Sequence, residues 1–408
     1  MPRAPYVTRA LEPVLRRAIR EFPAVVLTGP RQSGKTTLLR HLFARSHAYV
    51  SLDPPDVRAA AAADPRGFLD LNPPPVILDE VQQAPELLSF IKERIDRRRE
   101  RRGAYVLTGS QNLSMAHQVS ESLAGRAGIF RLPPLSSREI AGRRGPSPVL
   151  ATRPGRARPA MLQGLALWQT LVRGFYPEVA AEHGRDAHQW LASYVQTYLE
   201  RDVRSLRQVG DLSQFQMFLR ALAARSGQLL NLADISRDLG VALNTVKAWL
   251  SVLEATYQVV VVRPYSANVG KRLVKTPKVY FTDTGVLCYL MALRDAAHAA
   301  AGPVSGAIIE TAVLAELVKG ELGAGREPRV FFWRTSIGSE VDFLVETGGR
   351  LIPIEVKASS TPRPAMAAGI HALRRDLGHV VGPGYVIHTG DIVLPLGEGV
   401  TALPFGSL

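Results

Sequence analysis

The sequence predicts a mixed α/β protein that begins with a parallel, doubly wound sheet. Three observations predict this fold. Short apolar runs alternate with helical stretches between residues 24 and 132, a helix-turn-helix pattern follows at 232–253, and a strand-rich α/β segment extends from about residue 303. Strands that alternate with helices are typical of parallel sheets, because each crossover helix returns the chain to the same edge. We therefore expect a parallel-sheet part, a helical and winged-helix part, and a smaller C-terminal α/β part.

The expected elements follow in chain order. Apolar runs at 24–29, 48–52, 75–79, 104–109 and 128–132 predict the strands of the parallel sheet. A segment rich in proline, glycine and arginine then predicts a linker, because these residues end helices and strands. The sequence is divided into a first domain at 1–140, a linker at 141–163, a helical region at 164–228, a winged-helix module at 229–290 and a C-terminal domain at 303–408.

Composition limits the classes of protein. The 408 residues are 46% hydrophobic and 21% charged, which is typical of a globular chain and excludes a disordered or fibrous one. Lys and Arg number 50 against 36 Asp and Glu, for a net charge of +14. This balance favours a nucleic acid partner, or else reflects an arginine-rich solvated surface. A single cysteine excludes an intrachain disulfide, and no apolar run is long enough to span a membrane. We expect a cytoplasmic protein with no membrane association.

A phosphate-binding loop is predicted after the first strand. Residues 29–36 fit the pattern G-x-x-x-x-G-K-[ST], with a strand before and a helix after, as this motif requires. Its glycines let backbone N–H groups surround a phosphate, and the helix start adds the positive end of its dipole. Lys35 is expected to reach the β- and γ-phosphates, and Thr36 to bind Mg²⁺. The nucleotide-binding residues are expected to be Gly29, Pro30, Arg31, Gln32, Ser33, Gly34, Lys35, Thr36 and Thr37.

A pair of acids completes this candidate site. The apolar run at 76–78 leads into Asp79 and Glu80, which places two carboxylates at the end of a strand. Asp79 is expected to hold Mg²⁺ together with Thr36, while Glu80 orients or deprotonates the attacking water. The pattern predicts ATP and Mg²⁺ as cofactors and an ATP-hydrolysing enzyme.

Later residues extend the prediction. The strand at 105–108 ends close to Ser110 and Asn112, which are candidates for a sensor that contacts the γ-phosphate or the water. An ordinary turn is the alternative for both. Arg126 is a candidate arginine finger that acts on the ATP of a neighbouring subunit, which would require a homo-oligomer. A solvated or salt-bridged arginine is the alternative there.

The order of these motifs resembles that of the prokaryotic AAA+-like ATPases with a C-terminal domain of unknown function. The resemblance rests on the phosphate loop, Asp79-Glu80, Thr108-Gly109-Ser110 and Leu123-Ala124-Gly125-Arg126, and further blocks at 198–203, 244–250, 275–285, 340–343 and 354–357 are similar. It covers nearly the whole chain. The resemblance implies ATP binding and leaves the biological task unassigned.

The middle module predicts contact with DNA. Helices at 232–239 and 243–253 surround a glycine turn, and the apolar runs at 259–262 and 279–281 predict wing strands. Lys271, Arg272, Lys275 and Lys278 lie between or at the wing strands, which suits contact with phosphates. Winged helices also serve as lids or partner-binding modules, so this alternative stays open.

The C-terminal segment contains a candidate second metal site. Glu310 is predicted in a helix, Asp342 in a strand, and Glu355 and Lys357 in the next strand, after the Gly348-Gly349 turn. This pattern resembles the metal-dependent nucleases of the restriction-enzyme type. Two carboxylates can bind Mg²⁺, and Lys357 can orient a water beside a phosphate. A nuclease-like fold used only for binding, or a hairpin with ordinary salt bridges, is the alternative.

Together these features predict an ATPase of the AAA+ type that acts on or at DNA. The alternative is a nucleotide-gated switch or scaffold, in which the C-terminal domain binds a partner protein and cleaves no nucleic acid. The functional and the purely structural interpretations differ most at the C-terminal acids, Asp342 and Glu355 among them.

Overall fold

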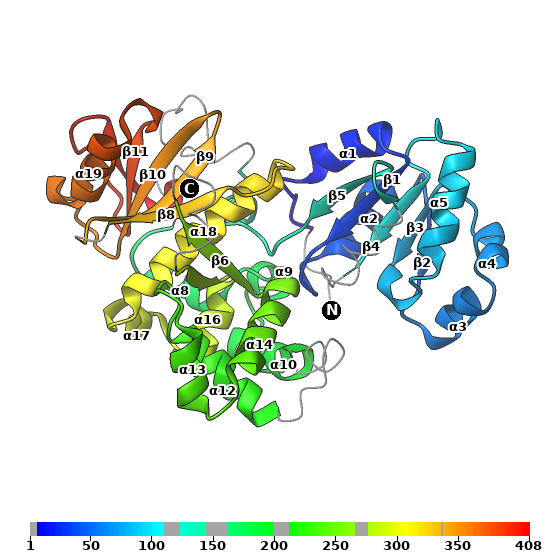
Figure 1. The fold of residues 1–408 in the computed structure, drawn as a ribbon, viewed down its shortest axis with the longest axis horizontal. Helices are drawn as coiled ribbons and strands as arrows, with labels where there is room; N and C mark the ends of the chain where they lie inside the picture. Colours follow the sequence, from blue (N-terminus) through cyan, green and yellow to red (C-terminus); the bar gives the residue numbers. More distant parts are fainter. Residues whose placement is uncertain (1–5, 110–122, 144–161, 200–211, 266–275, 336–337) are drawn as a thin grey trace.

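A computed structural model of the chain describes residues 6–109, 123–143, 162–199, 212–265, 276–335 and 338–408. The N-terminal sheet with its helices lies at the right of Figure 1, the C-terminal sheet at the upper left, and the green helical residues below. The long helix α18 (Ser305–Gly323) runs between the two sheets. Within the described residues, no helix is long and apolar enough to cross a membrane.

The N-terminal sheet has five strands, and all its pairs are parallel. They are β1 (Ala24–Thr28), β2 (Ala48–Ser51), β3 (Val76–Asp79), β4 (Tyr105–Thr108) and β5 (Ala127–Arg131). Their order in the sheet is β2-β3-β4-β1-β5. The predicted parallel sheet is therefore confirmed, and β4 lies between the strand before the phosphate loop and the strand that ends at Asp79.

Helices cover both faces of this sheet because successive strand residues point to opposite sides. Val25 and Leu27 pack with α1 (Glu12–Glu21) and α2 (Lys35–Phe43). Val26 packs on the other face, in an apolar cluster with α3 (Pro55–Ala63), α4 (Pro65–Leu71) and α5 (Leu87–Arg97). The short 3-10 helix η1 (Val81–Gln83) follows β3. Strands that are apolar on both faces thus form the centre of a three-layer structure.

The middle of the chain is mainly helical. Its elements are α7 (Ser137–Ile140), α8 (Gly164–Arg173), α9 (Pro177–Ala181), α10 (Ala187–Tyr194), the π-helix η2 (Val195–Leu199), α12 (Leu212–Ala223), α13 (Leu232–Leu239), α14 (Leu243–Ala255), α16 (Thr284–Leu290) and α17 (Ala296–Ala301). Asn231 caps α13 through its side chain, and Gly240 ends it with φ of 64°. The fully buried Ile235 and Val246 pack in one apolar cluster. Two helices therefore form around a glycine turn, as the sequence predicts.

The C-terminal sheet is mixed and begins earlier in the chain than the sequence suggests. It contains β6 (Val259–Pro264), β7 (Lys278–Phe281), β8 (Val330–Arg334), β9 (Glu340–Thr347), β10 (Arg350–Lys357), β11 (Gly384–His388), β12 (Leu394–Pro395) and β13 (Val400–Pro404). The order is β12-β13-β11-β10-β9-β8-β6-β7, with β6 parallel to β8. The strands expected in a winged-helix module therefore extend the C-terminal sheet, and one apolar core runs from α8 to β10.

Short elements complete this part of the fold. They are η3 (Pro364–Ala367), α19 (Ala368–Leu377), η4 (Gly378–Val380) and η5 (Phe405–Ser407). The predicted turn at Gly348 and Gly349 joins β9 to β10, with φ of 56° and 74°. Positive φ at both central residues suits a two-residue hairpin, and glycine adopts it without strain. This hairpin places Asp342 and Glu355 on neighbouring strands.

Candidate functional site

The phosphate loop has the backbone that its glycines permit. Gly29 adopts φ of 139°, and a Cβ there would lie 2.2 Å from the carbonyl oxygen of Leu132. Gly34 adopts φ of 91° at the N-terminus of α2. Both values lie in the region that L side chains rarely adopt, so the loop requires glycine at these positions. The chain thereby turns directly from β1 into α2, and the backbone N–H groups at the start of α2 become available to an anion.

Lys35 occupies this loop. Its ammonium group donates to the carbonyl oxygens of Gly29 and Pro30, at 2.9 Å each, and the residue is buried. The lysine side chain therefore lies along the loop, close to where phosphate oxygens would approach. Ser33 is fully buried and Thr37 is exposed, so the predicted binding residues differ in their access to solvent.

Three hydroxyl groups surround the carboxylate of Asp79. Thr36 Oγ1 donates to Oδ2 at 2.8 Å, Tyr49 Oη donates to the same oxygen at 2.6 Å, and Thr108 Oγ1 donates to Oδ1 at 2.5 Å. Asp79 and Thr108 are buried, and β2, β3 and β4 bring these groups together at one edge of the sheet. The structure thus joins Thr36 to Asp79 as the sequence predicts, and adds Tyr49 and Thr108. Tyr49 belongs to none of the sequence motifs, whereas Thr108 lies in the block Thr108-Gly109-Ser110, where the sequence assigned it no contact with Asp79.

Glu80 has an unusual backbone. It adopts φ of 59° and ψ of 45°, in the left-handed region, which is uncommon for a residue other than glycine. Its carboxylate accepts a hydrogen bond from the amide of Gln82. The two predicted sensor residues, Ser110 and Asn112, lie outside the described residues. Their strand β4 has the position that the prediction requires, next to β3.

Arg126 is salt-bridged within this chain. Its Nε and Nη2 atoms contact the two carboxylate oxygens of Asp96 at 2.6 and 2.9 Å. The next residue, Ala127, pairs with Ala24 at the start of β1, whereas the phosphate loop follows the other end of β1. At about 3.3 Å per strand residue, the two lie roughly 16 Å apart along the sheet. Arg126 therefore lies near the amino-terminal ends of the strands, whereas this chain's own phosphate loop lies at their carboxyl ends.

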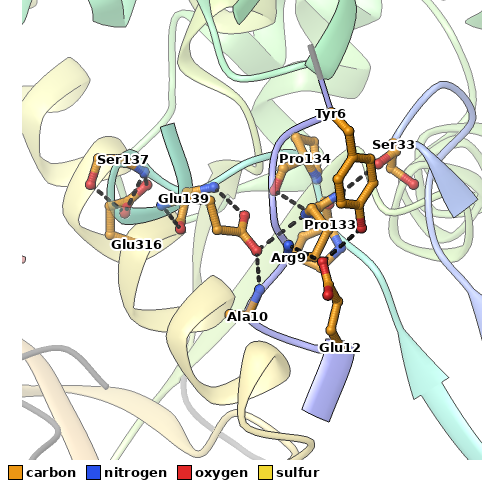
Figure 2. A network of polar contacts seen from close by, with 11 residues as sticks. Tyr6, Arg9, Ala10, Glu12, Ser33, Pro133, Pro134, Ser137, Glu139 and Glu316 are labelled. Carbon is orange, nitrogen blue, oxygen red and sulfur yellow. Dashed lines mark hydrogen bonds and ion pairs between the residues drawn. The ribbon is translucent and has the colours of Figure 1, made fainter. Parts of the chain in front are cut away.

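Arg9 is a further residue that the sequence analysis does not identify. Its guanidinium group donates to the carbonyl oxygen of Ser33 in the phosphate loop at 2.8 Å, and it is buried. Figure 2 shows this contact and the ion pair from Arg9 to Glu139. The contact joins residues that are far apart in the sequence, and no local pattern around Arg9 indicates it.

The four predicted C-terminal residues lie close together in a partly buried cluster, in which Glu355 is buried. Lys357 Nζ contacts Glu355 Oε1 at 2.6 Å, and Asp342 Oδ2 accepts a hydrogen bond from the backbone N–H of Val356 at 2.8 Å. Burial, and next the charge of Asp342, raises the pKa of Glu355 to about 8 and the pKa of Glu310 to about 7. Burial also raises the pKa of Asp342 itself. The remaining oxygen of Glu355, Oε2, is buried and has no hydrogen-bond partner among the described residues.

Lys278 supplies a cation to this cluster. Its ammonium group lies 3.2 Å from Glu310 Oε1 and 2.7 Å from Glu340 Oε1, and only 5% of the residue is exposed. The sequence predicts this lysine in a basic wing, whereas the structure buries it among acids. Lys271, Arg272 and Lys275 lie outside the described residues.

Within the described residues, no group of three or more His, Cys, Asp or Glu could hold a metal ion. A metal ion in the C-terminal cluster would therefore have only two carboxylates as protein ligands.

The parallel sheet and the phosphate loop define a P-loop nucleotide-binding protein. Residues 21–141 match the family model described as an AAA domain, 165–297 match a domain of unknown function (DUF8612), and 305–408 match a domain of unknown function (DUF4143). The AAA-type domain indicates an ATPase-like function.

Two uncharacterized mycobacterial proteins are similar over nearly the whole chain. One is from Mycobacterium tuberculosis and one from Mycobacterium bovis; each is 31% identical over 392 residues, which cover 96% of this chain and 82% of the relative. The chain belongs to the same family as these two proteins. A Walker-type ATPase of Pyrococcus abyssi aligns with a TM-score of 0.42 and 15% identity, over 69% of this chain and 94% of that structure.

Proposed function

We propose that this protein binds ATP with Mg²⁺ and hydrolyses it. The observation that carries the proposal is the hydrogen bond between Thr36 and Asp79, because it joins the two motifs in one place. A hydroxyl and a carboxylate are oxygen ligands of the kind that Mg²⁺ prefers, so these two residues fit the ion and would hold it. When bound, Mg²⁺ would neutralise phosphate charge. Lys35 would leave the loop carbonyls to contact the β- and γ-phosphates, and Glu80 would orient the attacking water.

The test compares ATP binding and turnover in three variants. Lys35→Ala should weaken ATP binding and abolish hydrolysis, because the loop loses its cation. Glu80→Gln should bind ATP normally and hydrolyse it at least about 100-fold more slowly. Glu86→Gln is the matched control, since Glu86 is exposed and lies a few residues beyond Glu80. Hydrolysis by Glu80→Gln at the parental rate would show that another residue handles the water.

We further propose that DNA is the partner. The support is the net charge of +14 together with the exposed side chains of Asn244 and Lys247 on the second helix of the helix-turn-helix. Filter binding to duplex DNA should show retention that falls steeply with salt, because released counterions drive such binding. Lys247→Ala should reduce that salt slope, and Arg97→Ala, an exposed arginine on α5, should leave it unchanged. No retention near physiological salt would favour a partner protein instead.

The C-terminal cluster supports a second candidate function, metal-dependent phosphodiester cleavage. The specific observation is Oε2 of the buried Glu355, which has no hydrogen-bond partner among the residues that the structure describes. Asp342 and Glu355 would hold the ion, and Lys357 would orient a water. Incubation of DNA with the protein and Mn²⁺ should produce cleavage that Asp342→Ala abolishes. Cleavage that survives Asp342→Ala would assign the activity to other residues or to a contaminant.

A further inference from the structure

The buried guanidinium group of Arg9 connects three elements. It donates to the carbonyl oxygen of Ser33 at 2.8 Å, to that of Pro133 at 2.6 Å, and to Glu139 Oε1 at 3.1 Å. Arginine has five N–H donors in a planar fork, so one side chain can serve several acceptors with fixed geometry. Figure 2 shows Arg9 at the centre of these contacts, between the phosphate loop and α7. Arg9 is therefore placed to fix the loop relative to the segment after β5.

The contact with Ser33 determines how the phosphate loop is presented. A peptide bond is planar and trans, so its C=O and N–H groups point in opposite directions. When Arg9 holds the Ser33 carbonyl, it also fixes the direction of the Gly34 N–H at the start of α2. Phosphate would contact the N–H groups of this turn. Arg9 can therefore act on a bound nucleotide through the loop without touching it.

The contacts continue from Arg9 to α18. Glu139 accepts hydrogen bonds from Arg9 Nε and the Ala10 N–H, and it forms the capping box of the single-turn helix α7 with Ser136. The neighbouring Ser137 donates through its N–H and its hydroxyl to Glu316 of α18, at 3.0 and 2.7 Å. We call Ser33, Arg9, Glu139, Ser137 and Glu316 the Arg9 relay. The middle of the relay, Ser137 and Glu139, lies in the single turn of α7. A displacement of this turn would therefore affect the contacts at both ends of the relay, Ser33 and Glu316.

Close packing supports the same connection. A Cβ on Gly323, at the end of α18, would lie 2.8 Å from Cβ of Ala10, and a Cβ on Gly325 would lie 2.7 Å from Val14. Ala10, next to Arg9, therefore packs against the end of α18, and Val14 of α1 packs against the residue two positions beyond that end, with no space for a side chain at either contact. In Figure 1 the end of α18 meets the start of α1. A shift of this N-terminal segment would have to displace α18 as well.

We infer that Arg9 is a positioning residue for the ATP site and that the Arg9 relay couples nucleotide binding to α18, the helix that carries Glu310. The inference rests on the proposed ATP binding. Coupling of this kind is reciprocal: if nucleotide binding changes the contacts of α18, then a change on α18 must alter nucleotide affinity by the same factor. Glu316 is far along the relay from the phosphate loop, so its effect on ATP affinity tests the coupling.

The experiment measures the dissociation constant of Mg-ATP in a Glu80→Gln background, where turnover is suppressed. Glu316→Gln should weaken ATP binding about five-fold or more. Ser137→Ala should weaken it by a smaller factor, about three-fold, because the Ser137 N–H still donates to Glu316. The matched controls change α18 contacts outside the relay and should stay within about two-fold of the background. They are Glu321→Gln, whose carboxylate pairs with Arg326, and Ser226→Ala, whose hydroxyl contacts Thr311.

A double variant distinguishes one coupled path from two separate effects. Arg9→Gln should weaken binding more than Glu316→Gln, and adding Glu316→Gln to it should cause little further loss, because the relay is already interrupted. Hydrogen exchange within 305–323 should slow when ATP is added to the background protein, and not when ATP is added to Arg9→Gln.

Three outcomes decide the matter. Relay variants that weaken binding while their controls do not would support the coupling. Affinities equal to those of Glu321→Gln and Ser226→Ala would overturn it, provided that the background protein binds ATP. Failure of the background protein to bind ATP would instead refute the proposed function. Because Ser137→Ala removes only a hydroxyl group, it keeps the test decisive if Arg9→Gln or Glu316→Gln does not fold.

Discussion

Removal of single hydroxyl groups around Asp79 tests how the candidate ATP site is built. Thr108→Val and Tyr49→Phe each delete one donor to this carboxylate and nearly preserve the shape of the side chain. Thr108 lies at the end of β4 and is fully buried, whereas Tyr49 lies on the edge strand β2 and is 37% exposed. The Asp79 carboxylate thus loses a buried hydroxyl donor in Thr108→Val and a partly solvent-exposed hydroxyl donor in Tyr49→Phe.

The two variants should differ in cost. A hydrogen bond to a charged group contributes about 1.5–3 kcal/mol to stability. The full contribution is lost where no water molecule can replace the donor. Thr108→Val should therefore lower the local free energy of opening by about 1.5–3 kcal/mol. Water can reach the position of the Tyr49 hydroxyl, so Tyr49→Phe should cost about 0.5–1 kcal/mol.

Hydrogen exchange of the β3 amides measures this cost locally, which matters because a chain with several parts need not unfold in one step. Thr256→Val is the control: Thr256 is 1% exposed, and its hydroxyl donates to the neutral carbonyl of Val252. It should leave the β3 amides unchanged. If Tyr49→Phe costs as much as Thr108→Val, the assumed replacement of the Tyr49 hydroxyl by water is wrong.

Further predictions concern assembly, metal and pH. If Arg126 acts on a neighbour, mixing Arg126→Ala with Lys35→Ala should restore part of the ATPase activity; strictly linear activity down to a demonstrated monomer would contradict this. Mn²⁺ should raise the melting temperature of the full chain, and Asp342→Ala should remove that rise. The pKa values of Glu310 and Glu355, about 7 and about 8, exceed the ordinary 4.5. The folded chain then binds more protons than the unfolded one, so without metal the free energy of unfolding should fall as pH rises from about 4.5 to about 8. Melts across this range that show no fall would contradict the buried cluster.

The N-terminal sheet was predictable because its information is local. Each strand is an apolar run, and the phosphate loop fits a pattern whose glycines the backbone requires at Gly29 and Gly34. Asp79 could be assigned for the same reason, since it directly follows such a run. The hairpin at Gly348 and Gly349 was also local, and it brought the C-terminal acids onto adjacent strands.

The remaining features depend on contacts between distant residues. Tyr49 reaches Asp79 because β2 happens to pair with β3, and Arg9 reaches Ser33 because the N-terminal segment crosses the loop. The burial of Lys278 has the same origin: it follows from the pairing of β6 with β8, which extends the C-terminal sheet beyond its expected start. The sequence around Lys278 predicts an exposed basic residue. Only the folded arrangement of α18 and β9 shows that Glu310 and Glu340 surround it.

The three parts of the chain meet at α18, and its buried acids determine how they meet. Apolar side chains cover nearly all sides of this helix, so hydrophobic burial specifies its rotation less than it would for a helix with one apolar face. Glu316 also pairs with Lys319 of its own helix. Glu310 contacts Lys278 and Glu316 contacts Ser137, so each acid has a further partner on another element. A buried charge is costly unless its partner is in place, and a shift of α18 would separate these pairs. The acids therefore favour one position for α18, in which the helix contacts the Arg9 relay through Glu316 and the C-terminal cluster through Glu310.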